Sequence, residues 1–376
     1  MGKMTLPQLK EYVANVVTAS KLSNGSFTAT YNNIVGLLDK IGKIITLDTN
    51  LAIDKLAEFE GEYLSFGKTI EEWQQDLIMV QDYDGDGAGA LAPHDPTYRP
   101  NFYSYTIGKK VIKSTIRNND IERAVHFVEQ FNEIVALQYK RLTDSMAQYR
   151  YGVKREMLGK FVALIEGANS TSGSNLWNSA TARTEGTLVY YVDGSSVNHF
   201  GIVVKAYASS DNKTWAEAIA DGFVIEYDLI STLAKPVDTQ TGEAFIKDVK
   251  RVVEKALDVS EGNSLNGNTL GAVEGLVLIV KQGVMPNLDV DTMAGAFHLD
   301  KVSVPARVIV VRDFGKETDD KCYGILMDQR AMRLHNTYRA TRENLNGDGD
   351  FLNLFLHTED TAWISRNAFI HIFKTA

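Results

Sequence analysis

The sequence predicts an α+β fold in which one long helix packs against β-sheets. Three observations carry this prediction. Apolar residues recur at helical spacing over residues 119–167. Apolar and polar residues alternate in parts of 56–115 and of 301–376, which is the pattern of half-buried strands. Residues 216–300 alternate helix-like and strand-like segments, and this order indicates a compact α/β unit.

The first 55 residues favour short amphipathic helices. Helical periodicity occupies 6–20 and 30–45, and the turn signal Ser23–Ser26 separates the two stretches. Segments this short cannot enclose a core of their own. Residues 1–55 are therefore expected to form an arm that lies on other surfaces, either of the same subunit or of a neighbour.

Residues 56–115 are typical of a long protruding hairpin. Alternating runs at 55–66 and 102–116 predict two strand-like arms, and the stretch between them is rich in Gly, Asp and Pro over 82–100. Thr69 and Glu72 have the spacing of a capping box, which predicts a brief helical turn.

The long helix is expected to begin at Asn119, with Glu122 completing its cap, and to end at Gly167. Gly152 and Gly159 inside it each cost about 1 kcal/mol relative to Ala, so one helix and two helices in line both remain open. The apolar stripe consists of Ile121, Val125, Val128, Val135, Leu142, Met146, Tyr149, Val153, Met157, Phe161 and Leu164.

The rest of the chain contains segments with the helical period of 3.6 residues and segments with the strand period of two. Strands are predicted at 187–192, 200–207 and 275–282, and helices at 214–223, 242–257 and 289–297. From 301 to 376 the period is two, which predicts an antiparallel sheet with Thr358–Asp360 as the turn of its last hairpin.

The charge balance limits the classes of partner. Lys and Arg number 39 against 48 Asp and Glu, which gives a net charge of -9. This balance argues against a protein that binds nucleic acid over most of its surface.

Cys322 is the one cysteine, so an internal disulfide and a cysteine-built zinc site are excluded. No apolar run approaches the ~18 residues that span a bilayer. A local basic surface is expected from the long helix, at Lys140, Arg141, Arg150, Lys154, Arg155 and Lys160.

The sequence nominates no catalytic, cofactor-binding or metal-binding residue. Its seven histidines form no pair with metal-ligand spacing. Asp82–Gly87 matches the first half of a calcium loop, but Pro93 stands where the bidentate Glu belongs, so a solvated acidic hairpin tip is favoured over a calcium-binding module. An α/β enzyme built on 216–300 is a further alternative, and it would need a pocket of converging polar groups.

Three segments resemble the major capsid proteins of phi29-like podoviruses, which have the tailed-bacteriophage major capsid fold. Residues 67–77 read GKTIEEWQQDL and resemble the extended-loop segment of that family. Residues 288–300 read LDVDTMAGAFHLD and resemble its Asp-Val pattern followed by a short Ala and Phe helix. The strands between 308 and 373 are similar to its closing segment. The order of arm, hairpin, long helix, α/β lobe and closing sheet also agrees.

The resemblance implies a shell subunit of five parts. It also implies assembly as pentamers and hexamers into an icosahedral capsid around double-stranded DNA, with help from a scaffolding protein and with a portal at one vertex. Such a protein is not an enzyme, carries no cofactor, contacts no membrane, and is found in the virion after assembly in the host cytoplasm. The parts are 1–55, the N-terminal arm; 56–115, the extended loop; 116–220, the peripheral domain with the spine helix; 221–304, the axial domain; and 305–376, the closing sheet of the peripheral domain.

The hairpin supplies the residues expected at contacts between subunits. Aromatic side chains dominate interface energetics, so Trp73, Phe102, Tyr103 and Tyr105 are predicted anchors, or alternatively they pack within the hairpin's own base. Lys68 lies in the same loop, and no motif assigns it a covalent bonding partner. An encapsulin-like nanocompartment, which is a shell of the same fold, is the alternative function.

Overall fold

The structure is a computed structural model of the 376-residue chain. The residues that it describes are 54–65, 67, 69–75, 98–102, 105–117, 128–258, 260–269, 275–284, 306–315, 321–349 and 351–376. They belong to two compact units. The first includes the described parts of Lys109–Tyr149 and Tyr338–Thr358, and the second those of Asp54–Gly108, Arg150–Thr337 and Glu359–Ala376.

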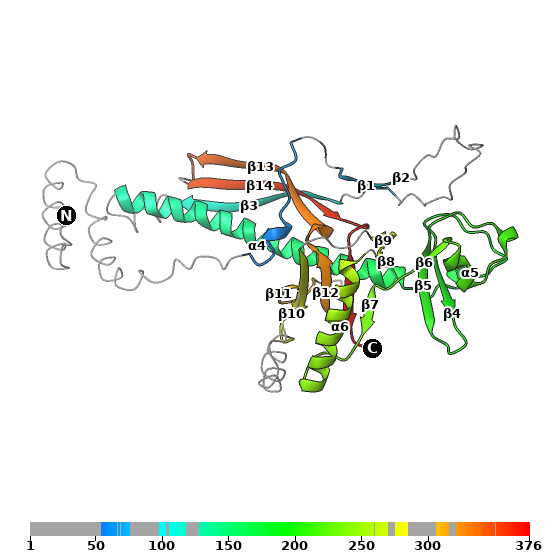
Figure 1. Cartoon of the computed structure of the whole chain (residues 1–376). Coiled ribbons are helices and arrows are strands. Elements are labelled where there is room, and N and C mark those ends of the chain that lie inside the picture. Colours follow the sequence, from blue (N-terminus) through cyan, green and yellow to red (C-terminus); the bar gives the residue numbers. More distant parts are fainter. Residues whose placement is uncertain are drawn as a thin grey trace, which may run out of the picture. The chain divides into compact units, whose positions relative to one another are not determined.

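The first unit contains most of a three-stranded sheet and part of the helix on which it packs. Strands β3 (Tyr105–Arg117), β13 (Met332–Asn346) and β14 (Phe351–Ile364) form a three-stranded sheet in the order β13-β14-β3. They run beside the N-terminal half of helix α4, Val128–Ala168 (Figure 1). Because strand side chains alternate between faces, one face of the sheet supplies the core. That core consists of Ile116, Leu142, Met146, Leu354 and Leu356.

Helix α4 confirms the predicted long helix within the residues described. It continues through Gly152 and Gly159, so this part of the chain is one helix and not two helices in line. It ends as predicted near Gly167, where the side-chain amide of Asn169 donates to the Ile165 carbonyl at 2.9 Å. The expected cap at Asn119 lies outside the described residues. Leu158, Val162 and Ile165 are fully buried although they lie off the predicted stripe, so the C-terminal half of the helix is covered on more than one side.

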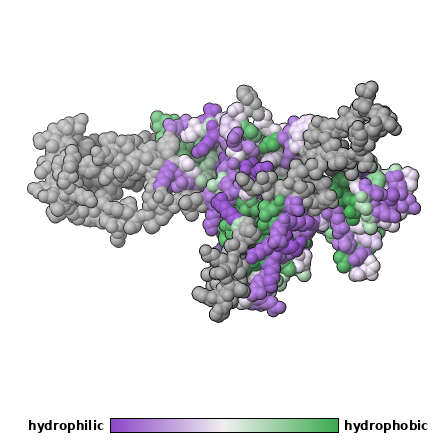
Figure 2. Space-filling view, in the orientation of Figure 1, coloured by the Kyte–Doolittle hydropathy of each residue, from purple (hydrophilic) through white to green (hydrophobic). Residues whose placement is uncertain are grey.

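The second unit contains a five-stranded sheet in the order β11-β10-β12-β15-β7. The strands are β7 (Ile230–Thr232), β10 (Leu276–Lys281), β11 (Arg307–Val311), β12 (Cys322–Asp328) and β15 (Ile370–Lys374). Helix α6, Thr239–Leu257, buries its apolar stripe against this sheet and presents a mainly hydrophilic outer face, purple in Figure 2. The apolar run at 276–280 is buried throughout, which explains its lack of alternation.

A smaller sheet of the same unit has the order β4-β5-β6. It comprises β4 (Leu188–Val192), β5 (Asn198–Val203) and β6 (Val224–Glu226), and it packs with α5 (Trp215–Ala220) around Trp177, Tyr207 and Trp215. Two two-stranded sheets complete the described strands. They are β1 (Glu71–Gln75) with β2 (Tyr98–Phe102), and β8 (Ser260–Ser264) with β9 (Gly267–Thr269).

Several predicted elements are confirmed, and others fall outside the described residues. The strands predicted at 187–192, 200–207 and 275–282 correspond to β4, β5 and β10, and the helices predicted at 214–223 and 242–257 to α5 and α6. The short helices expected in 1–55 and the helix at 289–297 lie outside the described residues. In the described part of the chain, no helix is both long and apolar enough to cross a membrane.

The strand predicted at 55–66 is wrong. Residues Ala57–Phe59 form a 3-10 turn, and the segment contributes one isolated bridge, Glu60 with Leu334. Leu56 and Phe59 are both fully buried. Residues three apart share a side in a 3-10 turn but take opposite faces in a strand, so the turn buries both.

The helical turn predicted at Thr69–Glu72 is also wrong, because Glu72 lies in strand β1. Backbone pairing of Glu72 with Asn101 of β2 replaces the local capping box. Tertiary pairing therefore outweighs the local signal at this position.

The closing segment is not one antiparallel sheet. Strands β11 and β15 belong to the five-stranded sheet, where β10 pairs β11 and β15 pairs β7 in parallel, while β13 and β14 belong to the other sheet. Thr358–Asp360 is not a turn, because it lies inside β14. These polar side chains are buried, and burial in a strand is acceptable since Asp360 has charged and hydrogen-bonding partners.

A buried histidine links strand β15 to the segment around β7. His371 is fully buried, its Nδ1 donates to the Asp228 carbonyl at 3.0 Å, and its Nε2 accepts from the Ser231 hydroxyl at 2.8 Å. A carbonyl can only accept, so these bonds fix the neutral Nδ1–H tautomer. Burial lowers the pKa of His371 to about 4, against the opposing effects of the Asp228 and Asp248 carboxylates, while Arg251 lowers it further.

This environment predicts acid sensitivity of the second unit. The unfolded chain binds a proton at His371 near pH 6.5, whereas the folded chain binds it only near pH 4. The neutral, buried His371 therefore contributes fully to the free energy of unfolding above pH 6.5, and this contribution is lost as the pH falls toward 4. The size is about 3 kcal/mol. Urea unfolding of the purified chain at pH 7 and pH 4.5 measures it. His371→Gln should show a smaller difference between the two pH values than the wild type, and His357→Gln serves as control. Equal pH dependence in wild type and His371→Gln would contradict the assignment.

Candidate assembly site

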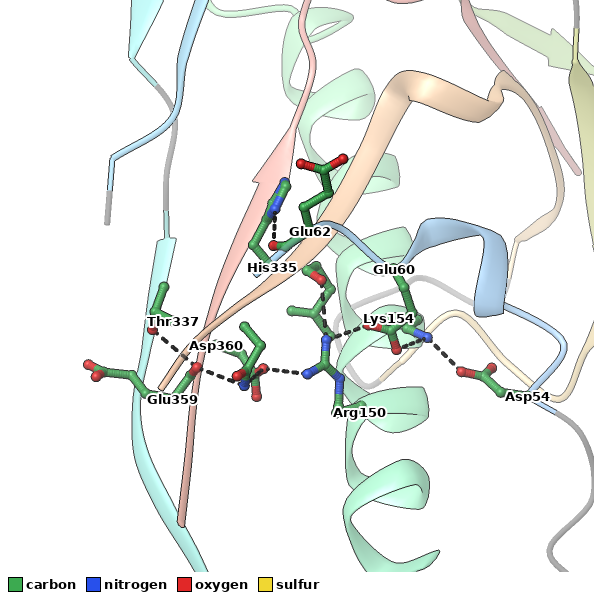
Figure 3. A network of polar contacts seen from close by, with 11 residues as sticks. Asp54, Glu60, Glu62, Arg150, Lys154, His335, Thr337, Glu359 and Asp360 are labelled. Atoms are coloured by element: carbon green, nitrogen blue, oxygen red, sulfur yellow. Dashed lines mark hydrogen bonds and ion pairs between the residues drawn. The ribbon is translucent and has the colours of Figure 1, made fainter. Parts of the chain in front are cut away.

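The base of the predicted extended loop is held on α4 by a cluster of charged groups, called the anchor network below. It consists of Asp54, Glu60, Arg150, Lys154 and Asp360, and Figure 3 shows them converging from the loop base, α4 and β14. The Lys154 side chain is 0% exposed, and its ammonium contacts Asp54 Oδ2 and Glu60 Oε1, each at 2.6 Å. A buried ammonium is expensive unless it is paired, so this pairing dictates where residues 54–60 lie.

Arg150 lies one helical turn before Lys154 and extends the network to two strands. Its guanidinium contacts the Glu60 carboxylate, the Asp360 carboxylate at 3.0 Å and the Leu334 carbonyl at 3.2 Å. Asp360 also accepts from the Asn336 amide at 3.0 Å. Residues four apart on a helix share a face, which is why both cations reach the same loop segment. One face of α4 thereby joins the loop base, β13 and β14.

The residue after Lys154 on the helix forms a second ion pair. Arg155 donates two hydrogen bonds to Asp313, at 3.0 and 2.9 Å. Gly315 follows with a positive φ of 88°, and a Cβ at this position would come within 2.9 Å of the Glu156 Cα. Only glycine permits this close approach of the loop after β11 to the α4 backbone.

The hairpin itself is a two-stranded antiparallel sheet with Trp73 opposite Pro100. Glu72 fixes its orientation, because its carboxylate accepts from the Ser365 hydroxyl and, at 3.3 Å, from the Arg366 backbone N–H. These partners lie between β14 and β15. The hairpin is thus tied at β1 to the turn that precedes the last strand.

The structure describes part of the predicted contact set. Trp73 on β1 is 62% exposed, and Tyr105, the first residue of β3, is 61% exposed. The Lys160 ammonium lies over the Tyr105 ring, 4.0 Å from its centroid. Phe102 ends β2, and its side chain lies outside the described parts. Lys68 and Tyr103 lie outside the described residues, so their contacts stay predictions.

Two residues of the expected basic surface have a different role. Lys154 is fully buried and Arg150 is largely covered, with 15% of its side chain exposed, so the prediction that they form surface is wrong. The sequence offers one signal for them, their spacing of four on α4, but their carboxylate partners are distant in the chain and carry no motif. Glu72 and Asp360 were missed for the same reason.

Metal chemistry receives no support from the described residues. In that part of the chain no three His, Cys, Asp or Glu side chains gather closely enough to hold an ion. The calcium-like loop Asp82–Gly87 lies outside it.

The anchor network predicts an asymmetric response to substitution. Asp54→Asn with Glu60→Gln leaves the buried Lys154 ammonium without an opposite charge, and the free energy of unfolding should fall by about 3–5 kcal/mol. Lys154→Met should cost less, below about 2 kcal/mol, because the two carboxylates left behind are partly exposed. Urea unfolding of the three chains gives the comparison.

The control for this measurement is an exposed pair on α6. Lys247 contacts Glu243 at 3.6 Å with both side chains exposed, and Lys247→Ala should change stability by less than about 0.5 kcal/mol. If Lys154→Met lowers the free energy of unfolding as much as Asp54→Asn with Glu60→Gln, the burial of the Lys154 charge is not the reason that the network is sensitive to substitution.

Comparison with solved structures identifies the fold. The chain is similar to a structure titled as the capsid of Staphylococcus phage Andhra, with TM-score 0.58 and 11% identity over 88% of this chain and 87% of that one. It is also similar to a chain from bacteriophage P68, with TM-score 0.51, 12% identity, and coverage of 88% and 87%. A chain in the capsid of cyanophage P-SCSP1u has TM-score 0.51, 8% identity, and coverage of 89% and 91%. At these identities the likeness shows the fold alone, a phage capsid-like fold of mixed helices and sheets.

Sequence comparison identifies the family. Curated protein sequences contain no match to this chain. A family model described as "Phi29-like phage major capsid protein" matches residues 6–374. Because that match covers almost the entire chain, as the resemblance of 67–77, 288–300 and the closing strands implies, the chain belongs to the Phi29-like phage major capsid protein family.

Proposed function

We propose that this capsid protein assembles as pentamers and hexamers into an icosahedral shell that encloses double-stranded DNA. The family match over residues 6–374 is the observation that carries the proposal. As a member of this family the chain is a structural protein of the virion, and the family is not an enzyme class. The family description also names a phage capsid protein, so the nanocompartment alternative is not favoured.

The β1–β2 hairpin is the element best suited to join subunits. An isolated two-stranded hairpin is marginally stable, because it cannot bury a hydrophobic face. Within the described residues β1 and β2 form a two-stranded sheet, and the edges of such a sheet are templates for contact with another chain. Trp73 adds a large exposed ring on the same element. In our proposal the hairpin lies on a neighbouring subunit, and repetition of this head-to-tail contact closes a ring.

The anchor network gives this hairpin a firm base. Lys154 and Arg150 hold residues 54–60, and Glu72 holds β1 to residues 365–366. A contact element fixed before binding loses less conformational entropy on association. The proposed contact set remains Lys68, Trp73, Phe102, Tyr103 and Tyr105.

The remaining expectations complete the proposal. Residues 1–55 act as an arm, 56–115 as the extended loop, 116–220 as the peripheral domain with α4 as its spine, 221–304 as the axial domain, and 305–376 as the closing segment. A scaffolding protein assists assembly in the host cytoplasm, a portal occupies one vertex, and packaged DNA contacts the shell weakly because the subunit is acidic overall.

Assembly of the purified chain tests the function directly. The chain, alone and with its scaffolding protein, is expected to give closed shells, tubes or six-fold rings in negative-stain microscopy. Sizing should show the corresponding high-mass peak. A monomer under both conditions, even at high concentration, would refute the proposal.

Trp73→Ala tests the hairpin contact. Truncation of a buried interface aromatic typically costs 2 kcal/mol or more, so the concentration at which assembly begins should rise at least roughly tenfold. Light scattering against protein concentration measures this threshold. Leu257→Ala is the matched control, since Leu257 at the end of α6 is 63% exposed and should leave the threshold unchanged. Equal thresholds for wild type and Trp73→Ala would remove Trp73 from the contact set.

A further inference from the structure

We propose that His199 is a pH-operated latch, which ties the turn between strands β4 and β5 to strand β6 when its ring is protonated. The turn consists of residues 193–197 and is called the latch turn below. The inference goes beyond the proposed function, because it concerns a response of the single subunit to pH.

Strand pairing places the parts of the latch on one face of the β4-β5-β6 sheet. Tyr191 of β4 pairs with His199 of β5, and Gly201 of β5 pairs with Glu226 of β6. Residues two apart on a strand share a face, so His199 and Glu226 point to the same side. Asp193 follows β4 two residues after Tyr191 and reaches the same ring.

Both nitrogens of the His199 ring face a carboxylate. Its Nδ1 lies 2.7 Å from Glu226 Oε1, and its Nε2 lies 3.5 Å from Asp193 Oδ2. An ionised carboxylate only accepts hydrogen bonds, and a neutral imidazole has one N–H to donate. A neutral ring would therefore point a lone pair at one of the two carboxylates. Both contacts are satisfied only by the protonated ring, which has two donors.

The groups around the ring favour the protonated form. Asp193 from the latch turn and Glu226 from β6 act on it as anions, and their hydrogen bonds, that of Glu226 first, raise the pKa of His199 above its ordinary value, against the opposing effect of partial burial. Tyr191 lies beside the ring with centroids 6.3 Å apart. Helix α5 presents the uncharged Trp215, which stacks on Tyr191.

The latch turn depends on the same aspartate. Asp193 Oδ1 accepts hydrogen bonds from the backbone N–H groups of Ser195, at 2.9 Å, and Val197, at 2.8 Å. Ser196 has a φ of 63°, a left-handed conformation that residues other than glycine adopt at a cost. One oxygen of Asp193 thus holds the turn, while the other oxygen is held by His199.

Loss of the proton releases the turn from β6. The neutral ring keeps its N–H on Nδ1, where the contact with Glu226 is shorter, so the contact with Asp193 is lost. Because the pKa of His199 is raised, the contribution of the latch to stability is complete below pH 6.5 and is lost as the pH rises through the folded-state pKa. This response is opposite in sign to that of His371.

A spin label on the latch turn measures its mobility directly. Ser195→Cys places the label at an exposed position of the full-length chain, and the fully buried Cys322 stays unlabelled. The label should be restricted at pH 5.5 and should move roughly twofold faster at pH 9, with a midpoint above pH 6.5. The same label on Ser209→Cys, in the separate 3-10 turn Ser209–Asp211, is the control and should show no such change.

Two variants separate the latch from other titrating groups. In the Ser195→Cys chain, His199→Gln should make the label equally mobile at both pH values. Asp193→Asn should do the same, although its side-chain oxygen can still accept from the turn backbone. A label that is insensitive to pH in the chain with His199 and Asp193 intact would overturn the proposal. The same pH response in His199→Gln would assign it to another group and also overturn it.

Histidine NMR judges the proton without the label. In the full-length chain with isotopically labelled histidines, the ring signal missing from His199→Gln identifies this residue. Its midpoint should lie above pH 6.5 and should fall in both Glu226→Gln and Asp193→Asn, because each removes an anion from the ring. A midpoint at or below 6.5, or one that neither variant lowers, would contradict the latch.

Discussion

The buried ammonium of Lys154 is the constraint on which the hairpin region depends. A cation with no exposure must keep its carboxylates within contact distance, and these come from Asp54 and Glu60, about a hundred positions earlier in the chain. The contact therefore does more than stabilise α4. It determines where the chain enters the hairpin region, and Arg150 extends the same fixed geometry to β13 and β14 through Leu334 and Asp360.

The parts of the fold that sequence reasoning could predict are those with a period of their own. Helices α4 and α6 and strands β4, β5 and β10 follow from local patterns, because each buries one face or is buried throughout. The errors fall where a distant partner decides the local conformation. Glu72 has a capping spacing yet lies in a strand, and Thr358–Asp360 reads as a turn yet lies inside β14.

Of the candidate site, sequence reasoning could predict which kinds of residue make contacts, but not which charged groups pair with each other. The exposed rings of Trp73 and Tyr105 could be nominated because aromatics on a hairpin are natural contact residues. The anchor network could not, since a buried Lys and a surface Lys look the same in one sequence. Its members lie on three separate segments, and only the fold shows that Arg150 and Lys154 face carboxylates.

The five-stranded sheet has a consequence for the order of synthesis and folding. Its strand β15 lies between β12 and β7 and aligns Ile372 with Ile230. Among the described strands β15 is the neighbour of β7 in this sheet, so β7 is paired only after the last strand has been made. Contacts this distant in sequence form late and slowly. A chain interrupted before residue 370 would lack the strand that joins β7 to the rest. A subunit therefore completes this sheet only after its final residues have been made.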